Sequence, residues 1–223
     1  MSTPKRVLIV VTSRDHIDES HRTGVWFEEF AIPYQEFLAQ GMEVTVASPL
    51  GGSIPLDPRS EPKPEEAPKT AVAREALQDT RLLSDVRSAD FDAIFIPGGH
   101  GAMFDLSQDE TLQRLLGELA TDDKVIASVC HGPAGLVQAR KADGTPLVAG
   151  KTITAFTNNE EEVGGLGPLM PFLLESRLRE LGGQFVVKPK WSDHVERDGN
   201  LITGQNPQSS RSITEAVIEA LKA

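Results

Sequence analysis

Short apolar runs rich in β-branched residues alternate with amphipathic segments along most of the chain. Residues 7–11 (Val-Leu-Ile-Val-Val) form one such run and stop at Thr12. A continuous apolar run of this length is typical of a strand buried on both faces of a parallel sheet. The predicted strands are residues 7–11, 43–48, 91–97, 125–130, 152–156, 185–187 and 201–203. The predicted helices are residues 24–40, part of 71–87, 110–119, 132–140, 171–181 and 212–221.

This alternation predicts an α/β fold, namely a doubly wound, mostly parallel sheet with helices on both faces (a flavodoxin-like layer sandwich). The 223 residues suffice for one sizeable core and show no internal repeat, so we expect a single domain over residues 1–223. Residues 50–70 contain five prolines and many charges, which predicts a long surface excursion of the kind that often serves a site. In such folds ligands bind beyond the carboxyl ends of the strands.

Composition narrows the classes of molecule that this chain can bind. The net charge is −11, from 33 acidic and 22 basic residues, which argues against non-specific binding to nucleic acid or to an anionic membrane. A single cysteine cannot form an internal disulfide. The apolar run 7–11 is too short for a signal segment or a membrane span. We therefore expect a cytoplasmic protein with a reduced thiol.

That single cysteine, Cys130, ends the apolar run 124–130 and is followed at once by His131, Gly132 and Pro133. A strand that turns directly into a helix would hold the sulfur in a sharp turn, with the first N–H groups of the helix pointing at it. Such a position favours the thiolate and makes a nucleophile. The alternative is a small buried core residue, the usual role of a lone cysteine.

Two neighbouring features suit acyl or carbonyl chemistry. The imidazole of His131 could activate the thiol, although adjacent side chains on a turn can diverge, and its backbone N–H is a natural oxyanion donor. The turn Gly98-Gly99-His100-Gly101 follows a predicted strand but lacks the dinucleotide-binding fingerprint. Gly98 and Gly99 would let the backbone approach a ligand and stabilise an oxyanion. A plain tight turn is the alternative.

Helical phase separates two adjacent glutamates on the first predicted helix. The apolar residues of that helix mark its buried face, and at about 100° per residue Glu29 lies roughly 70° and Glu28 roughly 170° from its centre. We expect Glu28 to be solvated. Glu29 can reach the core boundary, where burial would raise its pKa and make it a proton carrier. The alternative for Glu29 is a solvated carboxylate on the helix flank.

Three acids in a row, residues 160–162, follow the predicted strand 152–156. Composition favours a solvated loop, although one carboxylate at a strand end could orient a histidine. His194 has no partner at metal-ligand spacing, so we expect a loop or dimer-rim residue and assign no metal. Asn206-Pro207 and Ser209-Ser210 are typical of a turn and a helix cap that borders the same site.

Residues 127–133 (Ala-Ser-Val-Cys-His-Gly-Pro), together with the Gly98 turn and residues 203–207, resemble the ThiJ/PfpI superfamily, which is related to class I glutamine amidotransferase domains. Thr23-Gly24-Val25 leading to Glu29, and Phe156-Thr157 leading to Glu161, resemble more narrowly the glyoxalase III and heat-inducible chaperone branch. The resemblance covers the chain from about Arg6 onward. The larger chaperone members carry an added lid domain and metal ligands, for which we expect no room in this chain.

The resemblance implies a role for each matching residue. Cys130 would be the nucleophile, His131 its partner, and Glu161 the group that orients His131. Glu29 would be the protonated carboxyl beside the sulfur, and Gly99 with His131 would supply backbone oxyanion donors. It also implies a homodimer.

The function expected from the resemblance is a glutathione-independent glyoxalase that converts methylglyoxal to D-lactate through a cysteine hemithioacetal, in a carbonyl stress response, without a cofactor. Deglycation of proteins or nucleotides, or amide hydrolysis, by the same thiol is an alternative. A holdase chaperone or an oxidant-sensing protein is an alternative of another class. Classical glutamine amidotransferase activity, which places its catalytic histidine and glutamate far downstream as a spaced pair, is the less expected alternative.

Overall fold

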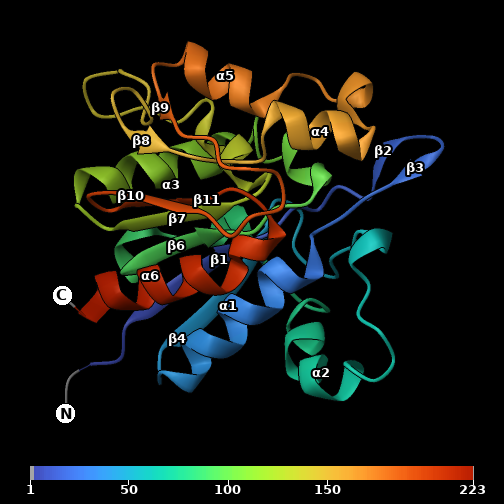
Figure 1. Cartoon of the computed structure of the whole chain (residues 1–223). Coiled ribbons are helices and arrows are strands. Elements are labelled where there is room, and N and C mark those ends of the chain that lie inside the picture. Colours follow the sequence, from blue (N-terminus) through green and yellow to red (C-terminus); the bar gives the residue numbers. More distant parts are fainter. Residues whose placement is uncertain (1–2, 223) are drawn as a thin grey trace.

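The computed structural model describes residues 3–222, and its centre is a seven-stranded sheet (Figure 1). Neighbouring strands are parallel except β10 and β11, which pair antiparallel at one edge. The strands, in spatial order, are β10 (Val195–Asp198), β11 (Leu201–Gly204), β7 (Val125–Val129), β6 (Ala93–Ile96), β1 (Arg6–Val10), β4 (Glu43–Ser48) and β5 (Arg81–Leu82). The predicted doubly wound, mostly parallel α/β fold is confirmed.

Helices cover both faces of this sheet (Figure 1). The helix α1 packs against α6 and α2 on one face, and α3 packs on the other. The α-helices are α1 (Phe27–Ala39), α2 (Ala67–Ala76), α3 (Glu110–Thr121), α4 (Asn158–Gly164), α5 (Leu174–Glu180) and α6 (Ser210–Lys222). Shorter elements are the hairpin β2 (His16–Asp18) and β3 (His21–Arg22), and a separate pair β8 (Thr152–Ile153) and β9 (Gln184–Phe185).

The alternation of side chains along β1 divides the core into two clusters. Val7 and Ile9 point to the face that α1 and α6 cover, whereas Leu8 and Val10 point to the face of α3. All four side chains are fully buried. Since a buried Val, Leu or Ile contributes about 1.5–3 kcal/mol, the continuous apolar run of β1 stabilises both layers at once.

Several predicted elements differ from the observed ones. The helix expected at 132–140 is only a 3-10 helix, η5 (Gly132–Leu136), since two glycines among five residues disfavour an α-helix. The glycines also allow a close approach to β6. A Cβ on Gly132 would lie 2.2 Å from the carbonyl oxygen of Ile96. The strand expected at 152–156 ends at Ile153, since the next backbone N–H donates to the hydroxyl of Thr203.

Other elements, among them α4, β10 and the β2–β3 hairpin, were not expected from the sequence. The helix α4 begins where a solvated acidic loop was predicted, and β10 is a short, half-buried edge strand whose polar composition resembles a loop. The helical stretch predicted within 71–87 begins earlier, as α2, and the later residues form β5 and the 3-10 helix η2 (Leu83–Asp85).

The Pro-rich segment 50–70 lies at the carboxyl end of the sheet, docked on the residues before α1. Val25 N–H donates to the carbonyl of Pro55 (2.9 Å), and Asp57 N–H donates to the carbonyl of Val25 (3.0 Å). A Cβ on Gly24 would lie 2.2 Å from the Pro55 oxygen, so only glycine permits this approach. The 3-10 helix η1 (Pro58–Ser60) is thereby held beside the strand ends.

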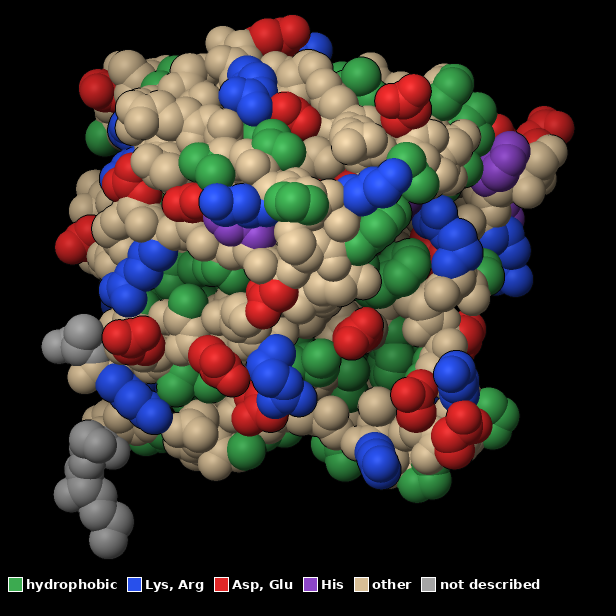
Figure 2. Space-filling view, viewed as in Figure 1, with side chains coloured by type: hydrophobic (Ala, Val, Ile, Leu, Met, Phe, Trp, Pro, Cys, Tyr) green, Lys and Arg blue, Asp and Glu red, His purple; other side chains and the backbone are tan. Residues whose placement is uncertain are grey.

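The surface in Figure 2 carries intermixed acidic and basic side chains. None of the helices in residues 3–222 combines the length and the apolar character needed to cross a membrane.

Candidate active site

Cys130 occupies a strained turn directly after β7. Its φ angle is +59°, a left-handed conformation that costs a non-glycine residue about 1–2 kcal/mol. The backbone is held from two sides, because Cys130 N–H donates to the carbonyl of Gly204 (3.0 Å) and its own carbonyl accepts from Phe156 (2.9 Å). Only 3% of the residue is exposed. The surrounding structure therefore fixes the position of the sulfur.

His131 and Glu161 continue from the sulfur in one chain of contacts. Cys130 Sγ lies 3.4 Å from His131 Nδ1, and His131 Nε2 lies 2.6 Å from Glu161 Oε2. The ring of Phe156 packs over the imidazole with centroids 4.4 Å apart, and Trp191 packs on Phe156. The two adjacent side chains of the turn do not diverge, so the imidazole stands between the thiol and a carboxylate.

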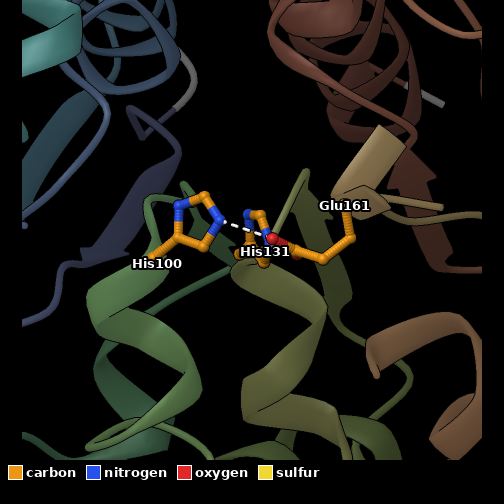
Figure 3. Close-up of side chains that lie close together, drawn as sticks. All are labelled: His100, His131 and Glu161. Atoms are coloured by element: carbon orange, nitrogen blue, oxygen red, sulfur yellow. Dashed lines mark hydrogen bonds and ion pairs between the residues drawn. The ribbon is translucent and has the colours of Figure 1, made fainter. Parts of the chain in front are cut away.

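A second histidine shares the same carboxylate (Figure 3). His100, in the 3-10 helix η4 (His100–Met103), places Nε2 2.9 Å from Glu161 Oε1. Its Nδ1 accepts from Arg59 (2.9 Å), and Arg59 forms two hydrogen bonds with Asp57, of 2.9 and 2.6 Å. From the sequence, His100 was identified only as part of a glycine turn, and neither Arg59 nor Asp57 was identified as a site residue. The one signal for them was that a long excursion often reaches a site.

The surroundings of Glu161 favour the ionised form of its side chain. Burial opposes ionisation, but hydrogen bonds from His100 and His131 outweigh it and hold the pKa of Glu161 well below its usual range. Burial lowers the pKa of His100 to about 4, and the nearby His131 acts in the same direction. At neutral pH the site therefore contains an ionised Glu161 beside a neutral His100.

Glu29 is fully buried next to the thiol. Its Oε2 accepts the backbone N–H of Gly98 (2.7 Å), and the carboxyl lies beside the Cys130 thiol, with no hydrogen-bond partner for Oε1 among residues 3–222. Burial raises the pKa of Glu29 to about 8, so the carboxyl keeps its proton at pH 7. The solvated-flank alternative for Glu29 is wrong, whereas Glu28 is exposed as the helical phase predicts.

The expectation of a thiolate stabilised by a helix terminus needs correction. Burial raises the pKa of the Cys130 thiol, as would a charged Glu29, and the backbone N–H of His131 opposes this only in part. The physical reason is that η5 is a five-residue 3-10 helix, too short for a strong dipole, in a dry site. Formation of the thiolate depends instead on Glu29 keeping its proton and on His131 accepting one.

The acidic run divides into three environments. Glu160 is buried and accepts from Trp191 N (2.9 Å), Asn206 Nδ2 (2.8 Å) and Gln205 Nε2 (3.1 Å). Glu161 is buried against the histidines, and Glu162 is exposed. The solvated-loop interpretation is therefore wrong for the first two residues. It failed because Thr157 and Glu160 form a capping box that starts α4. The contact with Asn206 also places the 206–207 turn beside the site.

The hydrogen bond from Gly98 to Glu29 contradicts the role of Gly98 as an oxyanion donor, because its only N–H is already donated. Its missing side chain instead makes room, since a Cβ there would lie 2.7 Å from Glu29 Oε2 and from His131 N. Gly99 has a φ of +104° and packs against Gly24. Gly99 and His131 as oxyanion donors stay predictions.

Three side chains of the site carry atoms that can ligate a metal. One donor atom each from His100, His131 and Glu161 lie within 4.8 Å of one another, a set that could hold a cation. Both histidines, however, already direct Nε2 at the carboxylate of Glu161. His194, which was assigned no metal, pairs with Glu196 (3.2 Å) just before β10.

The site thus combines a strained cysteine turn at the carboxyl edge of a doubly wound sheet with an adjacent histidine and two buried glutamates. The chain belongs to the DJ-1/PfpI family, whose model matches residues 22–220.

Its relatives include a glutathione-independent glyoxalase of Schizosaccharomyces pombe, which is 35% identical over 98% of this chain and 97% of its own length. The crystal structure of glyoxalase III from Candida albicans has a TM-score of 0.87, with 28% identity and 97% of each chain covered. The Rapid Encystment Protein 24 KDa of Francisella tularensis has a TM-score of 0.92, with 32% identity, 97% of this chain and 99% of its own covered. The glyoxalase III branch indicated by the sequence is thus among the relatives.

Proposed function

We propose that this chain is a glutathione-independent glyoxalase that converts methylglyoxal to D-lactate, with Cys130 as the nucleophile. Full-length relatives named as glyoxalases support the activity. The single observation that carries the mechanism is the buried chain of contacts from Cys130 Sγ to His131 Nδ1 (3.4 Å) and from His131 Nε2 to Glu161 (2.6 Å). The buried Glu29 carboxyl beside the thiol adds a proton carrier, because burial raises its pKa to about 8. A thiol with a proton carrier on one side and an imidazole on the other suits an internal proton transfer.

The reaction begins when Cys130 Sγ bonds to the aldehyde carbon of methylglyoxal. The thiol proton passes through His131 or Glu29 to the aldehyde oxygen, which gives a hemithioacetal. His131 lies 3.4 Å from the sulfur, and Glu161 would stabilise the imidazolium that forms when it accepts a proton.

The next step moves hydrogen between adjacent carbons. His131, or Glu29 once it has given its proton to the ketone oxygen, takes the proton from the former aldehyde carbon, and an enediol forms. A proton then returns to the former ketone carbon while the hydroxyl on the former aldehyde carbon loses its proton. The product is the thioester of lactate on Cys130. Water then cleaves the carbon–sulfur bond, which releases lactate and restores the thiol. One carbon is oxidised and its neighbour reduced, so the step balances within the substrate and one water.

The low exposure of the nucleophile favours a small substrate. Cys130 is 3% exposed and His131 1% exposed, so a three-carbon aldehyde can reach the sulfur more easily than a peptide amide can. This geometry ranks the glyoxalase reaction above peptide hydrolysis or the deglycation of a folded protein.

The test is D-lactate formation from methylglyoxal in glutathione-free buffer, followed by chiral chromatography. Cys130→Ser should abolish it, with a loss of about a thousandfold or more, because a serine hydroxyl gives up its proton far less readily than a thiol. His21→Gln, an exposed histidine of the β2–β3 hairpin, is the matched control and should keep full activity. An active Cys130→Ser enzyme would refute the mechanism.

A homodimer and a cytoplasmic location belong to the same proposal. The first rests on the family and the second on the reducing conditions that keep a lone thiol free. Sedimentation velocity measures the first, and cell fractionation measures the second.

A further inference from the structure

Glu161 lies between two histidines that are chemically identical but face different groups. His131 lies against the sulfur, whereas His100 lies against a guanidinium. The two imidazole rings are 4.0 Å apart, and each directs Nε2 at one oxygen of the same carboxylate. Either ring could in principle take the proton that Glu161 stabilises, so something must decide between them.

We infer that Arg59, held by Asp57, locks His100 as a neutral hydrogen-bond donor to Glu161 and so reserves the charge of that carboxylate for His131. Arg59 and His100 are positioning residues in this scheme. The inference deepens the proposed function, since it presumes that His131 partners Cys130, but its central test does not use glyoxalase turnover.

The direction of the hydrogen bonds follows from the chemistry of arginine. A guanidinium has donors and no acceptor. Arg59 lies 2.9 Å from His100 Nδ1, so that nitrogen must present its lone pair. The proton of His100 is then on Nε2, which donates to Glu161 Oε1 at 2.9 Å. A second proton on His100 would have to displace the guanidinium.

Arg59 is itself fixed in place. Asp57 has no exposed surface and accepts from Arg59 twice through its side chain and once through the backbone (3.0 Å). Thr23 donates to the same carboxylate (3.2 Å), and the guanidinium lies 5.8 Å from the centre of the Trp26 ring. This arrangement forms because residues 55–57 pair with Val25, so the Pro-rich segment supplies the lock.

The electrostatic surroundings agree with the geometry. The charged or titratable groups that face His100 are Arg59 and Asp57 from the Pro-rich segment, His131 from the cysteine turn, and Glu161 from α4. Burial is the main cause that lowers the pKa of His100, and Arg59 contributes in the same direction. His131 meets the same carboxylate without a guanidinium behind it, so charge that develops during the reaction settles there.

The same lock opposes metal binding by the three donors. Ligation through His100 Nε2 would require the ring proton to move to Nδ1, where it would meet the N–H of Arg59. A cation would therefore have to break the Arg59 contact, which gives the arginine a second consequence.

The central experiment is nitrogen-15 NMR of the histidine rings between pH 5.5 and 8.5, on the wild type, Arg59→Met and Arg74→Met. Arg74 is the matched control, because it comes from the neighbouring α2 and pairs with the exposed Glu61. The wild type and Arg74→Met should show His100 neutral throughout, with the proton on Nε2. Arg59→Met should show His100 populating both tautomers, because no guanidinium then faces Nδ1.

A second measurement follows the alkylation of Cys130 by iodoacetamide against pH. In Arg59→Met the Nδ1 of His100 is free to accept a proton, and His100 then competes with His131 for Glu161, so the alkylation rate below pH 7 should fall by about tenfold. Arg59→Lys keeps a donor and a charge and should recover most of the rate. His100→Gln keeps a donor toward Glu161, so its Cys130 should be alkylated faster than that of His100→Leu.

The inference is overturned if His100 in Arg59→Met stays neutral with the proton on Nε2 and the alkylation profile does not move. The proposed function can fail separately. A wild type that makes no D-lactate but shows the locked His100 tautomer would keep this inference and refute the glyoxalase activity.

Discussion

Replacing Glu29 by glutamine should stabilise the folded protein while it removes the proposed activity. The amide has nearly the shape of a protonated carboxyl, can accept the N–H of Gly98 and can donate toward Cys130. What it lacks is a proton to give or take. The change therefore separates the effect of burying this acid on stability from its proposed role in proton transfer.

The magnitude follows from proton linkage. The folded state keeps the proton on Glu29 up to about pH 8, whereas the unfolded chain releases it near the ordinary pKa of 4.5. Between these values the unfolded state binds fewer protons, so the free energy of unfolding falls as pH rises. Each pH unit removes about 1.4 kcal/mol, which amounts to about 3 kcal/mol between pH 4.5 and 7.

The assay is urea unfolding of the wild type, Glu29→Gln and Glu28→Gln at pH 5 and pH 7. The advantage of Glu29→Gln over the wild type should grow by about 2–3 kcal/mol from pH 5 to pH 7, and a gain of this size raises Tm by about 4–12 °C. Glu28→Gln changes an exposed carboxylate on the same helix, whose pKa burial raises less than that of Glu29, so its advantage over the wild type should grow less. An identical pH dependence for all three proteins would refute the assignment of a buried, protonated Glu29.

Two further substitutions test the backbone and the acidic run. Gly99→Ala should destabilise the protein by about 3 kcal/mol or more, measured by thermal unfolding, because its Cβ would lie 2.1 Å from the carbonyl oxygen of Gly24 at a φ of +104°. A Tm equal to the wild type would contradict this contact. Glu160→Gln should lower the free energy of unfolding in urea by about 2–4 kcal/mol, because a charged acceptor of buried hydrogen bonds is lost. Glu162→Gln, at an exposed position, should leave it within about 0.5 kcal/mol, and equal losses for both variants would contradict the burial of Glu160.

The sequence predicted the parts of the fold that depend on local periodicity. The apolar runs of β1 and β7 indicate strands buried on both faces, and the phase of α1 separates Glu29 from Glu28. These patterns suffice because burial selects the same residues that the sequence makes apolar. The cysteine turn follows from the same reasoning, since β7 ends directly before Cys130.

The parts that could not be predicted depend on contacts between distant segments. Glu160 and Glu161 look solvated by composition, and only Asn206 and the two histidines make their burial favourable. Arg59 lies 41 positions before the histidine that it contacts. For Cys130 the prediction was wrong in the opposite direction, since the sequence predicted a lowered thiol pKa. The rule about helix ends considers only local structure, whereas the whole fold buries Cys130 and raises its pKa.

The packing of Phe156 between His131 and Trp191, and of Arg59 over Trp26, has a spectroscopic consequence. These are the only two tryptophans of the chain, and each touches a group that touches the histidines. All of the protein's indole emission therefore originates one residue away from the site histidines, and quenching or a change of polarity there alters the whole signal. The molecule carries its own optical reporter, with no label to attach and no background from tryptophans elsewhere.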